Sequence, residues 1–210
     1  MGGASVGKTS LLSVYLKGIF PEKILPTIGV EFAVKEITLS DNSKIKFQIF
    51  DTAGQEKYRS IVSNYCRKAL GCFLVFDITN KNTFEQCKNF LFDVKQIAEP
   101  DCVFFLVGNK IDLNEQREVE KDDAMKFATS NEMYYIETSA KTNYKVNDAF
   151  QKLFECNILF FFNLFFYFYF FILVVAEENK KKVNFDSNDE YVHISQRKNV
   201  QINEDNSVCC

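Results

Sequence analysis

The sequence is poor in several residue types. It has no tryptophan, one histidine, three prolines and eight glycines in 210 residues. Its 25 basic residues are outnumbered by 28 acidic ones. This balance argues against a general nucleic-acid binder, which must neutralise a run of phosphates. No secretory signal opens the chain, so five scattered cysteines and a terminal pair are expected to stay reduced.

The residue pattern divides the chain into three regions. Residues 1–155 alternate strand and helix signals, which predicts an α/β fold with a mostly parallel sheet. Residues 156–176 are almost wholly apolar. Residues 177–210 are polar, lack a helix or strand period and end in Cys-Cys, so we expect a disordered tail.

A phosphate-binding pattern opens the chain. The segment from Gly2 to Thr9 satisfies G-x-x-x-x-G-K-[ST]. Its glycines let backbone N–H groups surround a phosphate at the start of the next helix. Lys8 is suited to neutralise β- and γ-phosphate oxygens, and the Thr9 hydroxyl is suited to bind magnesium.

A second pattern, from Asp51 to Gln55, follows an apolar strand. A carboxylate such as Asp51 at the end of a buried strand can bind magnesium through water. Gly54 can bring its N–H against a γ-phosphate, and Gln55 can orient a water molecule for attack. By itself this short pattern is equally explained by a turn after a strand.

Two further segments end buried strands and indicate a guanine pocket. In the first, which runs from Asn109 to Asp112, the Asp112 carboxylate can accept both the ring N–H and the exocyclic amine of guanine. Adenine lacks this pair of donors and would leave the carboxylate poorly paired. The second segment, Glu137 to Lys141, ends the last strand in the same way.

Together, in this order, the four motifs resemble those of the Ras superfamily of small GTPases. The nearest likeness is to the Rab family, in residues 28–33 (IGVEFA), 46–50 (KFQIF), 57–61 (KYRSI) and 65–69 (YCRKA), and in the terminal Cys-Cys. The resemblance runs from Gly2 to about Glu155 and resumes at the two terminal cysteines. It implies a P-loop NTPase three-layer fold with a mostly parallel sheet.

The resemblance also implies roles for particular residues. Gln55 would be catalytic, and Thr9, Thr27 and Asp51 would hold Mg²⁺. Phe20 would pack edge-on against guanine, and the aromatic trio Phe32, Phe50 and Tyr65 would be read by effectors. The implied nucleotide-binding residues are Gly2, Ala4, Ser5, Val6, Gly7, Lys8, Thr9, Ser10, Phe20, Thr27, Gly54, Asn109, Lys110, Asp112, Ser139, Ala140 and Lys141.

The implied function is a switch in vesicle trafficking that cycles between GTP and GDP. Its GTP hydrolysis would be slow unless a GTPase-activating protein stimulates it. Further partners would be an exchange factor, a GDP-dissociation inhibitor, an escort protein and effectors, but no nucleic acid. Lipid on Cys209 and Cys210 would anchor the protein to the cytoplasmic face of an intracellular membrane, with a cytosolic pool.

Two departures from the family pattern raise alternatives. The chain begins at the phosphate loop, so the first strand is expected to be missing and the true start to lie upstream. Residues 156–176 interrupt the last amphipathic helix, and removing 156–173 restores it. A translated intron, a membrane helix and a buried helix each explain this segment. The rival function is a truncated, non-catalytic product or a membrane-inserted protein without nucleotide cycling.

Overall fold

The computed structural model describes residues 1–23, 25–38, 42, 44–54, 64–158 and 206–209. The chain divides into two units, one of Met1–Glu155 with Asp205–Cys210 and one of Cys156–Glu204. In the second unit only residues 156–158 are described, and they are helical. The fold below is that of the first unit.

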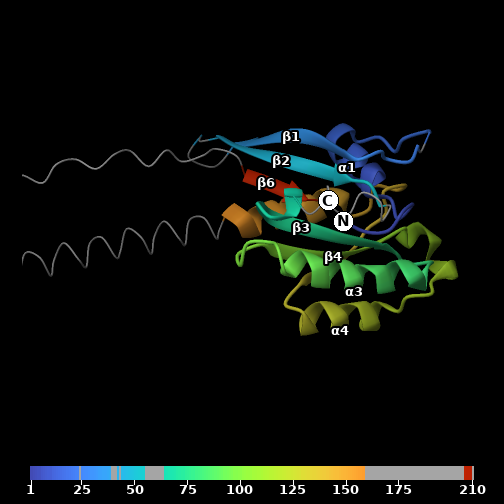
Figure 1. The fold of residues 1–210 in the computed structure, drawn as a ribbon. Coiled ribbons are helices and arrows are strands. Elements are labelled where there is room, and N and C mark those ends of the chain that lie inside the picture. The colour runs from blue at the N-terminus through green and yellow to red at the C-terminus, as the bar shows by residue number, and fades with distance from the viewer. Residues whose placement is uncertain (24, 39–41, 43, 55–63, 159–205, 210) are drawn as a thin grey trace, which may run out of the picture. The chain divides into compact units, whose positions relative to one another are not determined.

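The first unit alternates helices and strands, as the sequence predicted (Figure 1). Residues 146–155 also form a helix. The elements are α1 (Lys8–Lys17), β1 (Val30–Thr38), β2 (Lys44–Thr52), β3 (Ala69–Asp77), α3 (Lys81–Lys95), β4 (Val103–Asn109), the 3-10 helix η2 (Ile111–Gln116), α4 (Lys121–Ser130), β5 (Tyr134–Glu137) and β6 (Asn206–Cys209).

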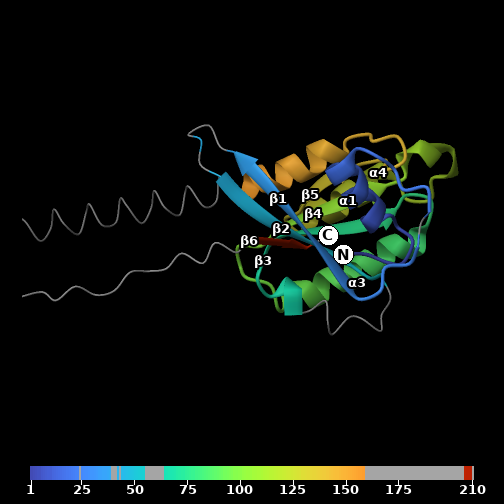
Figure 2. The same cartoon turned by 90° about the horizontal axis from the view of Figure 1, so that it is seen from above.

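The six strands form one sheet in the order β1-β2-β6-β3-β4-β5. Figure 2 shows the labelled strands of this sheet from above. β1 and β2 pair in antiparallel orientation, from Val30 opposite Thr52 to Thr38 opposite Lys44. The other neighbouring strands pair in parallel. The predicted α/β class with a mostly parallel sheet is therefore confirmed.

The position between β2 and β3 is filled in a way that the sequence did not predict. Strand β6 pairs there, with Cys209 opposite Phe50 on one side and Cys72 on the other. Beyond it, the Met1 carbonyl accepts a hydrogen bond from the Val75 N–H at 2.7 Å. The sequence does not predict this strand because residues 206–209 show no alternation of apolar and polar side chains. The strand depends instead on its backbone pairing with β2 and β3. It comprises the only tail residues that the structure describes.

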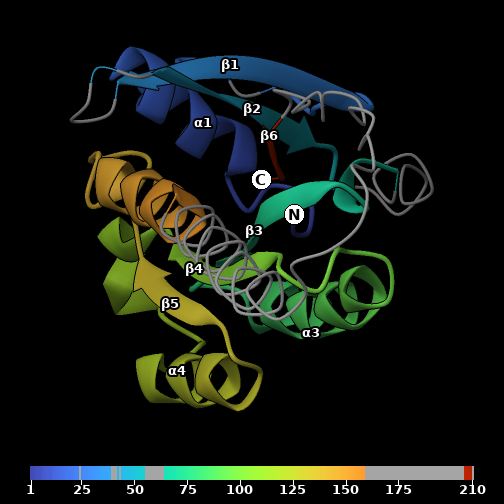
Figure 3. The ribbon, with the colours of Figure 1, turned by 90° about the vertical axis from the view of Figure 1, so that its left-hand side faces the viewer.

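Helices cover both faces of the sheet and make three layers (Figure 3). On one face, Phe47 stacks on Phe154 with ring centroids 4.2 Å apart, and Phe150 stacks on Tyr15 of α1 at 4.1 Å. On the other face, α3 and α4 cover buried residues of β3 and β4. Parallel strands between two helical layers bring their carboxyl ends to one edge, where such sheets bind ligands.

The predicted apolar segment lies almost entirely outside the described residues. Within the part that is described, no helix combines the length and the apolar character that a membrane crossing requires. The three interpretations of residues 156–176 therefore stay predictions.

Candidate functional site

A cavity of about 520 Å³ lies at the carboxyl edge of the sheet. Its volume falls within the usual range of small-molecule sites, about 300–1,000 Å³. Most of the predicted nucleotide-binding residues line it. These are Ala4, Ser5, Gly7, Lys8, Thr9, Ser10, Phe20, Thr27, Gly54, Asn109, Lys110, Asp112, Ala140 and Lys141. The structure thus gathers residues from distant motifs around one space.

Two glycines shape the phosphate loop and its contact with the loop that follows β2. Gly7 has φ 97°, and a Cβ built there would lie 2.4 Å from Nδ2 of Asn109. A Cβ on Gly54 would lie 2.3 Å from the Gly3 carbonyl oxygen. Both positions therefore require glycine, the first for its backbone conformation and the second for close approach of two loops.

Lys8 is a buried cation at the start of α1. Its Nζ donates hydrogen bonds to the carbonyls of Gly2 at 2.9 Å and Gly3 at 2.8 Å. Burial lowers the pKa of Lys8 to about 8, although the nearby Asp51 carboxylate raises it. A phosphate would relieve this cost, because it supplies negative charge at a helix N-terminus.

The three predicted magnesium ligands come together beside Lys8. The Thr9 hydroxyl lies 2.7 Å from the Thr27 hydroxyl and donates a hydrogen bond to Oδ2 of Asp51. Oδ1 of Asp51 is buried and has no hydrogen-bond partner among the described residues. Burial raises the pKa of Asp51, although Thr9 and Lys8 lower it.

This donor set fits Mg²⁺, since two hydroxyls and an unpaired carboxylate oxygen are hard ligands. Within the described residues, no group of three or more His, Cys, Asp or Glu could hold a metal. Magnesium commonly completes its shell with water and substrate phosphates. A site of this kind would therefore depend on the nucleotide.

The predicted guanine-binding residues are fixed by hydrogen bonds to one another. The Ser139 hydroxyl donates to Oδ1 of Asp112 at 2.6 Å and accepts from the Thr142 N–H at 3.1 Å. Ser139 does not line the cavity itself but holds the carboxylate that does. The sequence predicted that Ser139 lines the pocket, but the structure places it behind Asp112, outside the cavity lining.

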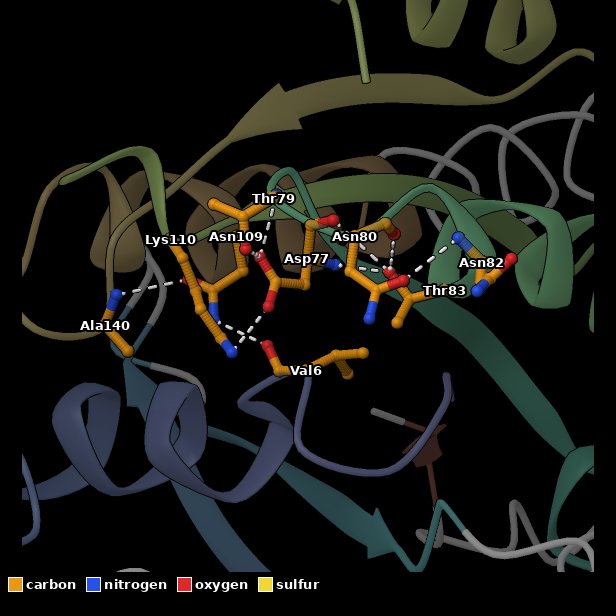
Figure 4. Close-up of polar contacts among 9 residues, drawn as sticks. All are labelled: Val6, Asp77, Thr79, Asn80, Asn82, Thr83, Asn109, Lys110 and Ala140. Atoms are coloured by element: carbon orange, nitrogen blue, oxygen red, sulfur yellow. Dashed lines mark hydrogen bonds and ion pairs between the residues drawn. The ribbon is translucent and has the colours of Figure 1, made fainter. Parts of the chain in front are cut away.

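Asn109 ties three loops together (Figure 4). Its Nδ2 donates to the Val6 carbonyl at 2.8 Å, and its Oδ1 accepts from the Ala140 N–H at 3.2 Å and the Thr138 hydroxyl at 3.3 Å. Val6 and Gly2 offer backbone carbonyls behind the cavity and do not line it. The buried Asn109 thus couples the phosphate loop to the base loops.

The aromatic trio predicted to face effectors is contiguous. Ring centroids are 6.3 Å apart for Phe32 and Phe50, and 4.8 Å apart for Phe50 and Tyr65. Phe32 is 70% exposed and Tyr65 36% exposed. Phe32 lies on β1, Phe50 on β2 and Tyr65 in the helical segment 64–66, and together the rings form an accessible apolar surface.

Some predicted residues fall outside the description, and some lining residues were not predicted. Gln55 and Cys210 lie outside the described residues, and Cys209 is placed only as part of β6. Leu25, Pro26 and Leu113 line the cavity without any sequence signal. Asp77, which contacts Lys110, carries a sequence signal: it ends a buried strand, as Asn109 does.

The fold and the loops around this cavity are those of a P-loop nucleotide-binding domain. Residues 1–158 match the Ras family. The chain is 47% identical over 150 residues to Ras-related protein RABA6a of Arabidopsis thaliana, covering 71% of this chain and 64% of that protein. It is 42% identical over 153 residues to Ras-related protein Rab-11C of Dictyostelium discoideum, covering 73% and 68%.

A third relative, GTP-binding protein ypt3 of Schizosaccharomyces pombe, is 44% identical over 151 residues, with 72% of this chain and 70% of that protein covered. The chain therefore belongs to the Ras family and, within it, to the Rab small GTPases. It spans slightly less than two thirds of the length of RABA6a and RABA6b, at 64% and 65%.

Proposed function

We propose that this chain is a guanine-nucleotide switch that binds GTP and GDP with Mg²⁺ and hydrolyses GTP slowly. The observation that carries the proposal is the Asp112 carboxylate, held by Ser139 at 2.6 Å in the same cavity as Lys8. One end of such a ligand must be a phosphate and the other a base with two adjacent donors.

Within this proposal, Lys8 and the backbone N–H groups of its loop bind the phosphates. Thr9, Thr27 and Asp51 would hold Mg²⁺, which neutralises charge on the phosphate oxygens when bound. Thr27 and Gly54 would contact the γ-phosphate of GTP and be released when it is lost. Gln55 would orient the attacking water.

The Rab relatives support a role in vesicle trafficking. The exposed trio of Phe32, Phe50 and Tyr65 is suited to effectors that bind the GTP form. An exchange factor, a GTPase-activating protein, a GDP-dissociation inhibitor and an escort protein would complete the cycle.

Lipid on Cys209 and Cys210 would place the protein on the cytoplasmic face of an intracellular membrane, with a cytosolic pool. Cys209 pairs with both β2 and β3 in strand β6. A transferase needs an accessible thiol in an extended peptide, so lipidation at Cys209 requires that β6 leave the sheet.

The full chain can be purified and its bound nucleotide released by denaturation and identified by chromatography. We expect stoichiometric GDP, and slow production of GDP from added GTP. Gln55→Leu should retain GDP binding and slow hydrolysis by about 100-fold, the usual scale for a residue that positions or activates a nucleophile. A purified chain that carries no nucleotide and takes none up would favour the non-catalytic alternative.

A further inference from the structure

Asp77 is a buried carboxylate next to the base loop, and none of the sequence motifs includes it. It ends β3 and lies opposite Asn109 of β4 in the parallel ladder. Its Oδ2 forms an ion pair with Nζ of Lys110 at 2.6 Å (Figure 4). Asp77 is 7% exposed and is largely shielded from water, whereas the Lys110 side chain is 31% exposed.

The Asp77 carboxylate is itself fixed by the turn that joins β3 to α3. Its Oδ1 accepts hydrogen bonds from the Thr79 N–H at 2.9 Å and the Thr79 hydroxyl at 2.7 Å. Asn80 stabilises the end of this turn. Its side chain caps α3 by accepting a hydrogen bond from the Asn82 N–H at 3.0 Å. Both carboxylate oxygens therefore have defined partners, and only Oδ2 faces Lys110.

Lys110 has a strained backbone and a flexible side chain, so other residues must fix its conformation. Its backbone lies in the left-handed region at φ 70°, which is unfavourable for a residue with a side chain. Its side chain lines the cavity between Asn109 and Asp112. A lysine has a long, freely rotating stem, and without an anchor it loses conformational entropy when a ligand packs against it.

Charge supports the same arrangement. Burial raises the pKa of Asp77, but the hydrogen bonds from Lys110 and Thr79 outweigh it and leave that pKa below its usual value. The carboxylate is therefore ionised at neutral pH, and the pair is a charge-assisted hydrogen bond.

We propose that Asp77 is a positioning residue that anchors Lys110 along the wall of the nucleotide cavity and thereby slows nucleotide release. The inference rests on the proposed function, since it concerns the same cavity. Asp77 does not line that cavity, so it acts through Lys110 and not by touching the nucleotide.

The test is the release of a fluorescent GDP analogue from the preloaded full chain into excess GDP. Asp77→Asn keeps the shape and an oxygen for Thr79 but removes the charge that holds Lys110. We expect release to become about ten- to twentyfold faster, near the lower end of the range for one hydrogen bond to a charged group. In a Lys110→Met background, the same substitution should change release by less than twofold, because its partner is already gone.

Glu85→Gln is the matched control. It makes the same change in an exposed ion pair, between Glu85 and Lys88 of α3 at 2.7 Å, and should leave release unchanged. Thr79→Val removes one of the two hydrogen bonds to Oδ1 and should accelerate release by about two- to threefold. It replaces Asp77→Asn in the comparison if that variant does not fold, as judged by circular dichroism.

The outcomes separate this inference from the proposed function. A wild-type chain that takes up no GDP analogue overturns both. A wild-type chain that binds it while Asp77→Asn releases it at the same rate overturns the inference alone. The inference is also overturned if Asp77→Asn accelerates release equally in the wild-type and the Lys110→Met backgrounds. Asp77 would then act on the turn and not through Lys110.

Discussion

The two ends of the cavity differ in how far they are organised without a ligand. At the base end, Ser139 holds Asp112, and Val6 and Ala140 hold Asn109, so both of these side chains have hydrogen-bond partners. At the phosphate end, Lys8 is bound to loop carbonyls. There Asp51 keeps one buried oxygen without a partner among the described residues.

This difference indicates a division of labour. A preformed base end can discriminate between bases at little cost in reorganisation. The phosphate end holds desolvated groups of both signs that a phosphate and a divalent cation would satisfy. We infer that base identity is set by fixed geometry, whereas the strength of binding depends on phosphate and magnesium.

Asp112→Ala should have the largest effect, because it removes the centre of the preformed end. Two donors of guanine would be left unpaired in the cavity, at about 1–3 kcal/mol each. We expect GDP affinity to fall about 1,000-fold in titration calorimetry, with little change for ADP. Glu115→Ala, on the same helix η2 and exposed, is the control. A loss of less than tenfold would mean that the base end does not select guanine.

Thr9→Ala tests the phosphate end. In Mg²⁺ we expect GDP release to accelerate about 100-fold, since contacts to charged groups contribute about 1.5–3 kcal/mol. After magnesium is removed with a chelator, wild type and variant should release GDP at the same rate. Ser13→Ala, also on α1, should behave as wild type. If the difference persists without magnesium, the hydroxyl has a structural role and does not bind the metal.

Much of this division could be read from the sequence, because short motifs after buried strands imply a shared edge. The positions of Asp112 and Asp51 follow from that rule, and that of Lys8 follows from the phosphate-loop pattern at the start of the chain. The hydrogen bonds that hold the neighbouring side chains cannot be predicted in this way, because the motifs do not specify their backbone partners. Asn109 donates to the Val6 carbonyl, and Asp77 accepts from the Thr79 N–H. Strand β6 escaped prediction for the same reason, because β2 and β3 provide its partners.

Ser139→Ala should have a smaller effect, because it removes a support and not a ligand contact. Loss of its 2.6 Å hydrogen bond to Asp112 should lower GDP affinity about tenfold. The effect should vanish in an Asp112→Ala background. Ser130→Ala, exposed on α4, provides the matched change. An undiminished effect in that background would show that Ser139 contacts the nucleotide directly.

The smallest change is expected in the core beneath the site. Burial raises the pKa of Cys72 and of Cys87 to about 12, so at pH 8 both thiols are protonated. Stripping nucleotide and magnesium should loosen the phosphate end but leave these thiols unreactive toward a disulfide reagent. Full reactivity in denaturant gives the reference. Rapid labelling of the stripped, folded chain would show that the two ends are not independent of the core.

The most direct measurement is a pair of calorimetric titrations of the nucleotide-stripped full chain in Mg²⁺, one with GDP and one with ADP. A fixed Asp112 carboxylate predicts a preference for GDP of at least about 1,000-fold, because adenine offers no matching pair of donors. Equal affinities for the two nucleotides would contradict the account.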